Sequence, residues 1–334
     1  MFGMMKTSSI YRISPLSIVD TTGADSAAIV HNITTNEVKK LVVGEGRETF
    51  VTDVRGKTIG HGFLYRLEDR FRLIGAGGQS DRIVAHIDRY TIREDAVPTI
   101  RDADFVALVL RPGVADELGI KLDSCDTNAI TTDAAVIGDV TIGNIRVQRY
   151  RTRWLGEGTD VILVAPDDID QLEQWLASKA IDIGDEAALH AARTAAGFPW
   201  YGIDLTDANL PQEADRDDLA ISFTKGCYLG QETVARLDAL GQVQKKLVRW
   251  SICGATPEKD ATLVANEKTV GRLTSIAVLT TNRDSGSNSA PPMDAIAIGF
   301  ARRSHFDAAA TAKGTTAEGK DFNATVLDAN VLRE

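Results

Sequence analysis

The pattern of apolar residues changes near Gly241, and this change constrains the fold of the chain more than any other feature. Before Gly241, strand-like runs alternate with segments whose apolar residues recur at helical spacing. After it come short strand-like runs, such as 245–253 and 295–300, separated by turn residues. Short strands of this kind are typical of a small β-barrel. The sequence therefore predicts an α+β region over 1–240 and a C-terminal β-barrel domain over 241–334.

The region before Gly241 combines strand and helix patterns in an order typical of a ferredoxin-like α+β domain. In chain order the predicted elements are strands over 48–53, 58–65 and 70–74, a helix after Gly78, and a buried strand over 105–110. A further helix is predicted over 186–196, because Asp185 stands where a cap belongs and Gly197 follows the last turn. A chain of 334 residues exceeds one small core, so we expect two or three domains in the whole chain.

Charge, hydropathy and cysteine usage narrow the function classes. The formal net charge of −10 argues against broad binding to DNA or RNA. No apolar run reaches the roughly 18 residues of a membrane span, and the N-terminus lacks the apolar stretch of a signal peptide. We therefore expect a cytoplasmic protein. The cysteines, Cys125, Cys227 and Cys253, are widely spaced without a Cys-x-x-Cys pair, so we expect neither a disulfide framework nor a metal site.

The segment KGCYLGQE, residues 225–232, concentrates the most chemically useful groups. It follows a strand-like run over 219–223 and precedes a helical run over 233–237, so it is predicted to be a strand-to-helix turn. A thiol is nucleophilic as thiolate, and a nearby lysine or a helix N-terminus favours that form, which makes Cys227 beside Lys225 a candidate nucleophile. The alternative is an inert buried thiol, because cysteine is among the most buried residue types. Spacing alone leaves both interpretations open.

A second group of candidates precedes this segment: Arg193, Trp200, Asp204 and Glu213. A carboxylate can form paired hydrogen bonds with the edge of a pterin ring, an arginine can bind an acidic tail, and a tryptophan can stack on an aromatic ligand. The same residue types also suit a capping arginine, solvated loop carboxylates and a core aromatic. A third candidate, the turn DVRGK at 53–57, is explained as a hairpin turn unless a pocket lies next to it. Residue types leave these alternatives open.

The order of residues in these segments resembles one known family. KGCYLGQE at 225–232 is similar to the signature K-G-C-[YF]-x-G-Q-E of the YgfZ branch of the folate-binding superfamily that includes the glycine-cleavage T-protein. The turn at 53–57 resembles the D-x-x-G-K turn of that branch. Residues 193–213 resemble its R-x-x-x-G-x-P-x-x-G-x-D segment, which is followed by P-Q-E. The resemblance extends over nearly the whole chain.

This resemblance implies three domains in a cloverleaf around a central folate pocket, with tetrahydrofolate as the cofactor. Two of these domains are expected to be intertwined α+β domains within 1–240, and the third is the barrel over 241–334. It also implies a role in assembling or repairing iron–sulfur proteins, including enzymes that modify tRNA, with those proteins or their assembly factors as partners. Cys227 is then expected to be the reacting group, with Lys225 adjusting its reactivity. The residues expected to contact folate are Glu213, Asp204, Arg193, Trp200, Gly230, Gln231 and Glu232.

The alternative within the same superfamily is an aminomethyltransferase, the T-protein of the glycine cleavage system. The T-protein pattern carries an aspartate shortly after the equivalent turn, whereas here the residues TIGH at 58–61 follow Lys57 without an acid. T-proteins also lack the K-G-C signature, so the resemblance favours the iron–sulfur role. Two classes of function stay open from the sequence: a folate-dependent enzyme that uses Cys227, and a folate-sensing scaffold that docks on iron–sulfur enzymes.

Overall fold

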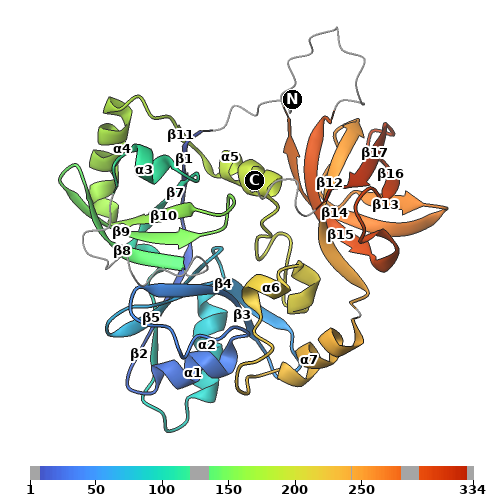
Figure 1. Cartoon of the computed structure of the whole chain (residues 1–334). Coiled ribbons are helices and arrows are strands. Elements are labelled where there is room, and N and C mark those ends of the chain that lie inside the picture. The colour runs from blue at the N-terminus through green and yellow to red at the C-terminus, as the bar shows by residue number, and fades with distance from the viewer. Residues whose placement is uncertain (1–7, 121–134, 242, 280–292, 329–334) are drawn as a thin grey trace.

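The computed structural model describes residues 8–120, 135–241, 243–279 and 293–328. Figure 1 shows three lobes, of which two share one long sheet and the third is the C-terminal barrel. The sheet has 11 strands, and the barrel closes in the order β12-β15-β14-β13-β16-β17. The predicted combination of a mixed α+β region and a C-terminal β-barrel is therefore confirmed.

Two groups of strands form the long sheet, and they meet where β3 pairs with β8. The order across the sheet is β11-β1-β7-β10-β9-β8-β3-β4-β5-β2-β6. The bounds of its strands are β1 Ile10–Ile13, β2 Ser17–Thr22, β3 Glu45–Thr52, β4 Thr58–Arg66, β5 Arg70–Gly75, β6 Val97–Ile100, β7 Val106–Leu110, β8 Ala135–Ile142, β9 Ile145–Thr152, β10 Thr159–Val164 and β11 Ile183–Gly184.

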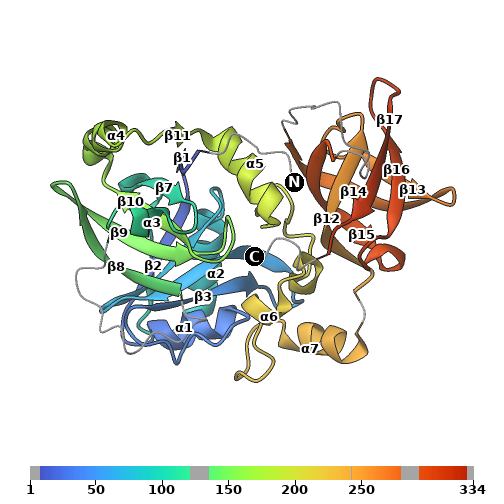
Figure 2. The same cartoon turned by 45° about the horizontal axis from the view of Figure 1, so that its top comes forward.

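Helices cover the faces of the sheet and connect it to the barrel. Their bounds are α1 Ser26–Ile33, α2 Ser80–Tyr90, α3 Val114–Glu117, α4 Ile169–Ser178, α5 Glu186–Ala196, α6 Asp217–Ala220 and α7 Gln231–Leu240. Helices α1 and α2 pack on the strand group that contains β2 and β5. Helix α5 lies between the sheet and the barrel and contacts both β1 and β14 (Figure 2). None of the helices in the described part of the chain is long and apolar enough to cross a membrane.

Strand β10 shows why the middle of the sheet is apolar on both faces. Val161 and Leu163 belong to the core cluster that continues toward the barrel. Ile162 and Val164 belong to a second cluster, which also contains buried residues of α4. Because successive side chains of a strand point to opposite faces, a strand covered on both faces is apolar at every position.

The barrel has its own interior and also shares the core of the sheet. Its strands are β12 Lys245–Gly254, β13 Thr262–Ala265, β14 Lys268–Val278, β15 Ala295–Arg302, β16 Thr311–Thr315 and β17 Asp321–Val326. Trp250 and Phe322 are among the fully buried side chains of its interior. Leu247, Ile298 and Phe300 instead belong to the cluster that contains Val161 and the sheet residues around it. One apolar core therefore runs from the sheet into the barrel.

The helix predicted over 186–196 is confirmed as α5. The Asp185 side chain accepts a hydrogen bond from the Ala188 nitrogen at 2.9 Å, and Gly197 after the helix has φ of 80°. The strand expected over 219–223 is wrong: Ala220 ends α6, and the chain then continues without regular structure to α7. Ala220 and Ile221 are buried in the shared core, and a short apolar run does not by itself separate such a buried connection from a strand.

Candidate functional site

Three segments that the sequence singled out meet at one place, which we call the motif junction. They are the turn at 53–57, the loop at 208–213 and the KGCYLGQE motif at 225–232. The turn contacts the loop, because Lys57 Nζ donates a hydrogen bond to the Ala208 carbonyl oxygen at 2.6 Å. The turn also contacts the motif, through the glycines described below. The junction lies where the last segments before the barrel pack on β3 and β4.

The turn at 53–57 is stabilised by its own aspartate. The Asp53 carboxylate accepts hydrogen bonds from the backbone nitrogens of Arg55, at 2.9 Å, and Lys57, at 2.8 Å. An aspartate commonly stabilises a turn in this way. The prediction of a turn at this position is confirmed, and the structure adds that the turn packs against the motif.

Gly230 of the motif lies directly against this turn. A Cβ atom at Gly230 would lie 2.5 Å from both the Asp53 carbonyl oxygen and the Gly56 nitrogen. Gly230 also has φ of 79°, which favours glycine. Beside this contact, Thr52 Oγ1 donates a hydrogen bond to the Leu229 carbonyl oxygen at 2.7 Å. The glycine at 230 therefore allows two backbone segments to touch.

Glu213 lies at the edge of the motif junction that faces the barrel. Its Oε2 accepts a hydrogen bond from Asn209 Nδ2 at 2.6 Å and lies 3.6 Å from Lys245 Nζ of β12. Asn209 is itself fixed, because its carbonyl oxygen accepts a hydrogen bond from the Thr58 nitrogen. Glu213 is 8% exposed, and no hydrogen bond from a described residue reaches its Oε1. That oxygen can accept a hydrogen bond from a ligand.

Lys225 anchors the motif to the end of α1. Its ammonium group donates hydrogen bonds to the carbonyl oxygens of His31, Thr34 and Asn36 at 2.7, 2.6 and 2.8 Å. It also lies 4.9 Å from the centroid of the Tyr228 ring, a cation–π distance. Burial lowers the pKa of Lys225 to about 7, while the carbonyl oxygens favour its charged form.

Cys227 is exposed, and a histidine that sequence reasoning missed lies beneath the motif beside it. A Cβ atom at Gly226 would lie 3.7 Å from His31 Nε2, and His31 Nδ1 lies 3.3 Å from Glu37 Oε1. Burial and the charge of Lys225 lower the pKa of His31, so the imidazole is neutral at pH 7. No local pattern could reveal this neighbour, because His31 precedes Lys225 by 194 positions.

Gln231 and Glu232 begin helix α7, with Gly230 at the N-cap position. Glu232 is exposed and Gln231 is half-buried. A carboxylate in the first turn interacts favourably with the positive end of the helix dipole. The structure thus gives Glu232 a local role in starting α7 beside the motif junction.

Arg193 and Asp204, both expected to contact folate, form a buried ion pair with each other. Arg193 Nη1 lies 2.5 Å from Asp204 Oδ2, and Arg193 Nη2 donates a hydrogen bond to Ser275 Oγ at 2.8 Å. Asp204 Oδ1 accepts hydrogen bonds from Ser275 Oγ at 2.6 Å and Thr274 Oγ1 at 2.5 Å. Both charged side chains are at most 1% exposed. The pair connects α5 and the loop after it to β14 of the barrel.

Trp200 lies in the core rather than at a surface. Its ring packs edge-on against Trp154, with centroids 5.0 Å apart, and against His190, at 5.4 Å. Only 5% of Trp200 is exposed. A ligand would have to displace one of these neighbours to stack on the ring.

A buried charged cluster beside the junction also escaped the sequence analysis. Glu48 of β3 accepts hydrogen bonds from Arg216 through Nε and, at 2.6 Å, Nη2, and lies 2.9 Å from His61 Nε2. Burial raises the pKa of Glu48, but the charges and hydrogen bonds of Arg216 and His61 outweigh burial and lower that pKa to about 2. The Arg216 guanidinium lies 4.8 Å from the Phe198 ring centroid. Glu48 therefore stays ionised as part of a packed network.

Two cavities border the start of β12. Lys245 lines a groove of about 540 Å³ on the barrel and faces Glu213. Lys246 lines a cavity of about 290 Å³ between the barrel and the end of α5, and its Nζ lies 2.9 Å from Asp215 Oδ1. Neighbouring residues of a strand point to opposite faces, which places the two lysines in different cavities. Of these two cavities, the groove at Lys245 is the one that meets the motif junction.

A solved structure defines the class of fold. The glycine cleavage system aminomethyltransferase T from Bartonella henselae matches with a TM-score of 0.77 over 98% of this chain and 87% of that chain. The sequences are 16% identical, so the match shows a shared fold. The fold is that of an aminomethyltransferase-like protein, with an α+β region and a barrel.

Sequence comparison identifies the family to which the chain belongs. The family model described as the GCVT N-terminal domain matches residues 4–225. The chain belongs to this family, and thereby to the T-protein superfamily. The aminomethyltransferase of Symbiobacterium thermophilum is 23% identical over 290 residues, which cover 80% of this chain and 74% of the relative. The aminomethyltransferase of Bacillus subtilis is 24% identical over 275 residues, which cover 79% and 74%.

Proposed function

We propose that this protein binds tetrahydrofolate at the motif junction, with the pterin ring against Glu213. The observation that carries the proposal is the position of this carboxylate, which is 8% exposed, has Oε1 open to a ligand, and lies 3.6 Å from Lys245, which lines the groove on the barrel. A pterin offers N–H donors along one edge, which suit a carboxylate, and folate carries carboxylates at its other end, which suit cations. Membership of the T-protein superfamily supports the proposal.

The other expected folate residues act in this proposal by holding the site in place. The buried pair of Arg193 and Asp204 fixes the loop that leads to Glu213 relative to the barrel. Trp200, which belongs to this loop, packs against Trp154 in the core. Gly230, with Gln231 and Glu232 after it, keeps the motif against the turn at 53–57.

The first candidate for the reaction is aminomethyl transfer to tetrahydrofolate. Both relatives described above are named aminomethyltransferases, and the matching solved structure is one as well. These comparisons favour aminomethyl transfer over the iron–sulfur role that the motif resemblance implies.

The second candidate is support of iron–sulfur proteins through Cys227, and one observation favours it. The thiol is exposed on a segment that Lys225 anchors, and the neutral imidazole of His31 lies under the adjacent Gly226. A neutral histidine can accept or donate a proton, and this one lies one residue along the motif from the exposed thiol. This arrangement supports a protein whose thiol acts on a partner.

Titration calorimetry tests the folate site. We expect the native protein to bind tetrahydrofolate and Glu213→Ala to bind it at least about tenfold more weakly, because a hydrogen bond donated to a buried carboxylate is worth about 1.5–3 kcal/mol. The control is Glu318→Ala, which removes an exposed carboxylate paired with Lys320 on the barrel. A native protein that does not bind tetrahydrofolate would show that the proposal is wrong.

Two assays separate the candidate reactions. The first mixes the protein with tetrahydrofolate and an aminomethyl-lipoyl carrier protein, and release of ammonia with formation of methylenetetrahydrofolate supports aminomethyl transfer. The second expresses Cys227→Ala in cells that lack the native protein and measures iron–sulfur enzyme activities. Full recovery of those activities by Cys227→Ala excludes the thiol role.

A further inference from the structure

We propose that the cavity between the barrel and the end of α5, which we call the charged cavity, binds a free α-amino acid with an apolar side chain. Its volume is about 290 Å³, near the lower end of the range for small-molecule sites. Such sites often lie where domains meet. The walls of this cavity come from the end of α5, from the segment just before α6 and from the barrel. The proposal does not depend on the folate site.

The charged cavity is separate from the groove that meets the motif junction. In the described part of the chain the two share no lining residue. Glu213 pairs with Lys245 of the groove, whereas Asp215, two positions later, pairs with Lys246 of the cavity at 2.9 Å. A ligand of the charged cavity therefore contacts a different set of side chains from a ligand of the groove.

The described lining of the charged cavity carries both signs of charge in equal number. Its cationic side chains are Arg216, Lys246 and Arg249, and its carboxylates are Asp215, Asp307 and Asp328. A ligand with a single charge would meet like charges as often as opposite ones. The ammonium and the carboxylate of a free α-amino acid are both ionised at pH 7 and are joined through one carbon atom. Such a dipolar ligand can form ion pairs with both kinds of side chain.

Asp307 is the carboxylate that we assign to the ammonium group of the ligand. It is exposed, and no hydrogen bond or ion pair joins its carboxylate to another described residue. Asp215, in contrast, already contacts Lys246. A ligand ammonium would therefore give Asp307 an ion pair without breaking a contact of the protein.

Lys246 and Arg249 are the cations that we assign to the carboxylate of the ligand. Lys246 Nζ lies 5.0 Å from the centroid of the Phe306 ring, which also lines the cavity. Arg249 Nη2 donates a hydrogen bond to the Asp328 carbonyl oxygen at 2.9 Å. The stem of Arg249 packs on Gly197, where an added Cβ atom would lie 2.6 Å from Arg249 Cδ. The glycine at the end of α5 thus lets this arginine of the barrel lie against the helix.

The rest of the lining includes an apolar wall. Leu247, Ile298 and Val326 belong to it, with the half-buried ring of Phe306 beside them. Contact with these side chains removes apolar surface of a ligand from water, which favours binding. This wall suits an aliphatic side chain, so we expect leucine to bind more tightly than glycine.

A ligand-observed NMR titration of the full-length protein with L-leucine tests the proposal. We expect binding at millimolar concentrations. Isocaproate, which lacks the ammonium group, and isoamylamine, which lacks the carboxylate, should bind about fivefold more weakly, because a partly exposed ion pair contributes about this factor. Asp307→Asn and Lys246→Gln should weaken the binding of L-leucine by a similar factor.

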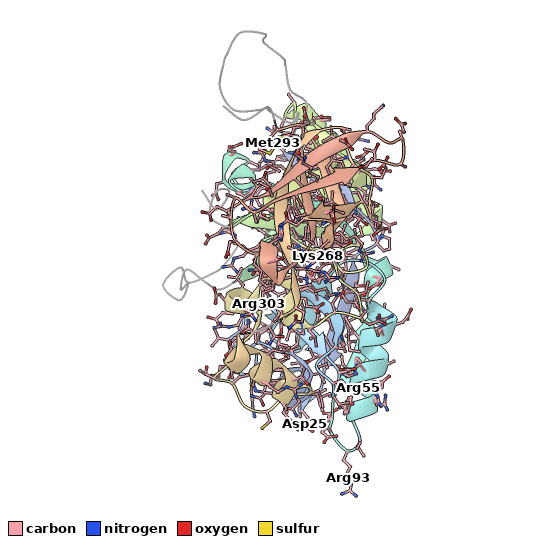
Figure 3. The ribbon with its side chains drawn as sticks, turned by 90° about the vertical axis from the view of Figure 1, so that its right-hand side faces the viewer. Asp25, Arg55, Arg93, Lys268, Met293 and Arg303 are labelled. Carbon is pink, nitrogen blue, oxygen red and sulfur yellow. The ribbon has the colours of Figure 1, made fainter. Side chains whose placement is uncertain are left out.

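Two matched controls change exposed charges that do not line the cavity. They are Asp88→Asn on α2 and Lys268→Gln on β14, and Lys268 is labelled on the barrel in Figure 3. Both variants should keep the native affinity for L-leucine. If Asp307→Asn and Lys246→Gln keep it as well, the amino acid binds elsewhere and the assignment to this cavity is wrong.

The ligand series supplies the remaining outcomes. Absence of L-leucine binding would overturn the proposal. Equal binding of isocaproate or isoamylamine would show that the cavity does not recognise a dipolar ligand, and equal binding of glycine would contradict the role of the apolar wall. Displacement of L-leucine by tetrahydrofolate would make the cavity part of the folate site. If tetrahydrofolate does not bind at all, the folate proposal fails and the amino-acid site stands.

Discussion

Gly230 and Gly56 lie in backbone contact, although the chain between them forms most of the long sheet. A Cβ atom at Gly230 would lie 2.5 Å from the Gly56 nitrogen. The KGCYLGQE motif and the DVRGK turn are therefore one packed unit. Two sequence signatures that could be read as independent sites support each other directly.

Replacing Gly230 by alanine should separate these segments. We expect Gly230→Ala to lower the free energy of unfolding by about 3 kcal/mol, because the added Cβ overlaps backbone atoms and φ is 79°. The control is Gly241→Ala, where φ is 58° and no atom lies within 4 Å of the added Cβ. Its cost should be about 1 kcal/mol, from backbone strain alone. Urea denaturation measures both, and equal losses would contradict the contact.

Lys225 should prove to be an anchor. Lys225→Met leaves three carbonyl oxygens of His31, Thr34 and Asn36 without their donor, so we expect a loss of about 2–4 kcal/mol in the free energy of unfolding. Lys57→Met removes one such hydrogen bond, to Ala208, and should cost less than about 1 kcal/mol. Limited proteolysis should also cut Lys225→Met faster within the motif. If the two variants are equally stable, Lys225 does not anchor the segment.

Asp217 should make stability depend on pH. Its Oδ1 is buried without a hydrogen-bond partner, and burial, with the charges of Asp215 and Asp218, raises the pKa of Asp217 to about 7. The unfolded chain releases this proton near pH 4, so the free energy of unfolding should fall as the pH rises from about 4 to 7. Asp217→Asn should therefore be more stable than the native protein at pH 8, by up to about 4 kcal/mol, and equal to it near pH 4.

Denaturation at a series of pH values measures this dependence. The control is Asp88→Asn on α2, an exposed aspartate that does not contribute to the pKa shift of Asp217 and whose substitution should change stability little at any pH. A constant difference between Asp217→Asn and the native protein across this pH range would rule out the assigned titration.

Cys227 should react with thiol reagents before Cys253 does. Cys227 is exposed, whereas Cys253 is partly buried and has its pKa raised by burial and by Asp294. The thiolate is the reacting form, so we expect labelling of Cys227 at pH 7.5 to be about tenfold faster. Mass spectrometry after brief alkylation measures the two rates. Cys227→Ala should lose the fast phase, and equal rates at the two positions in the native protein would be inconsistent with the exposed thiol.

The sequence predicted features that depend on local order. The cap at Asp185 and the glycine at 197 marked the limits of α5, and the switch to short strands after Gly241 marked the barrel. The strand expected over 219–223 was wrong, because burial beside the shared core makes a connection as apolar as a strand. Local patterns report on burial more reliably than on the backbone conformation that achieves it.

The site could be predicted only in part, because its residues come together through tertiary contacts. Glu48 and Arg216 are hydrogen-bonded although they are 168 positions apart. Lys225 of the motif donates a hydrogen bond to the His31 carbonyl oxygen, 194 positions earlier in the chain. Arg193 and Asp204 have residue types that suit a ligand, yet they bind each other. A sequence shows which charged groups exist, whereas the partner of each one is decided by the packing of distant strands.

The apolar core that runs from the sheet into the barrel limits how the protein can evolve. If the barrel were cut away, Leu247, Ile298 and Phe300 would be exposed to water, at a cost of about 1.5–3 kcal/mol for each large side chain. A segment with this liability cannot be exchanged between proteins as an independent module, because it would bring an aggregation-prone patch with it. The lobes are distinct in outline, but because they share one apolar core they must be kept together in one protein.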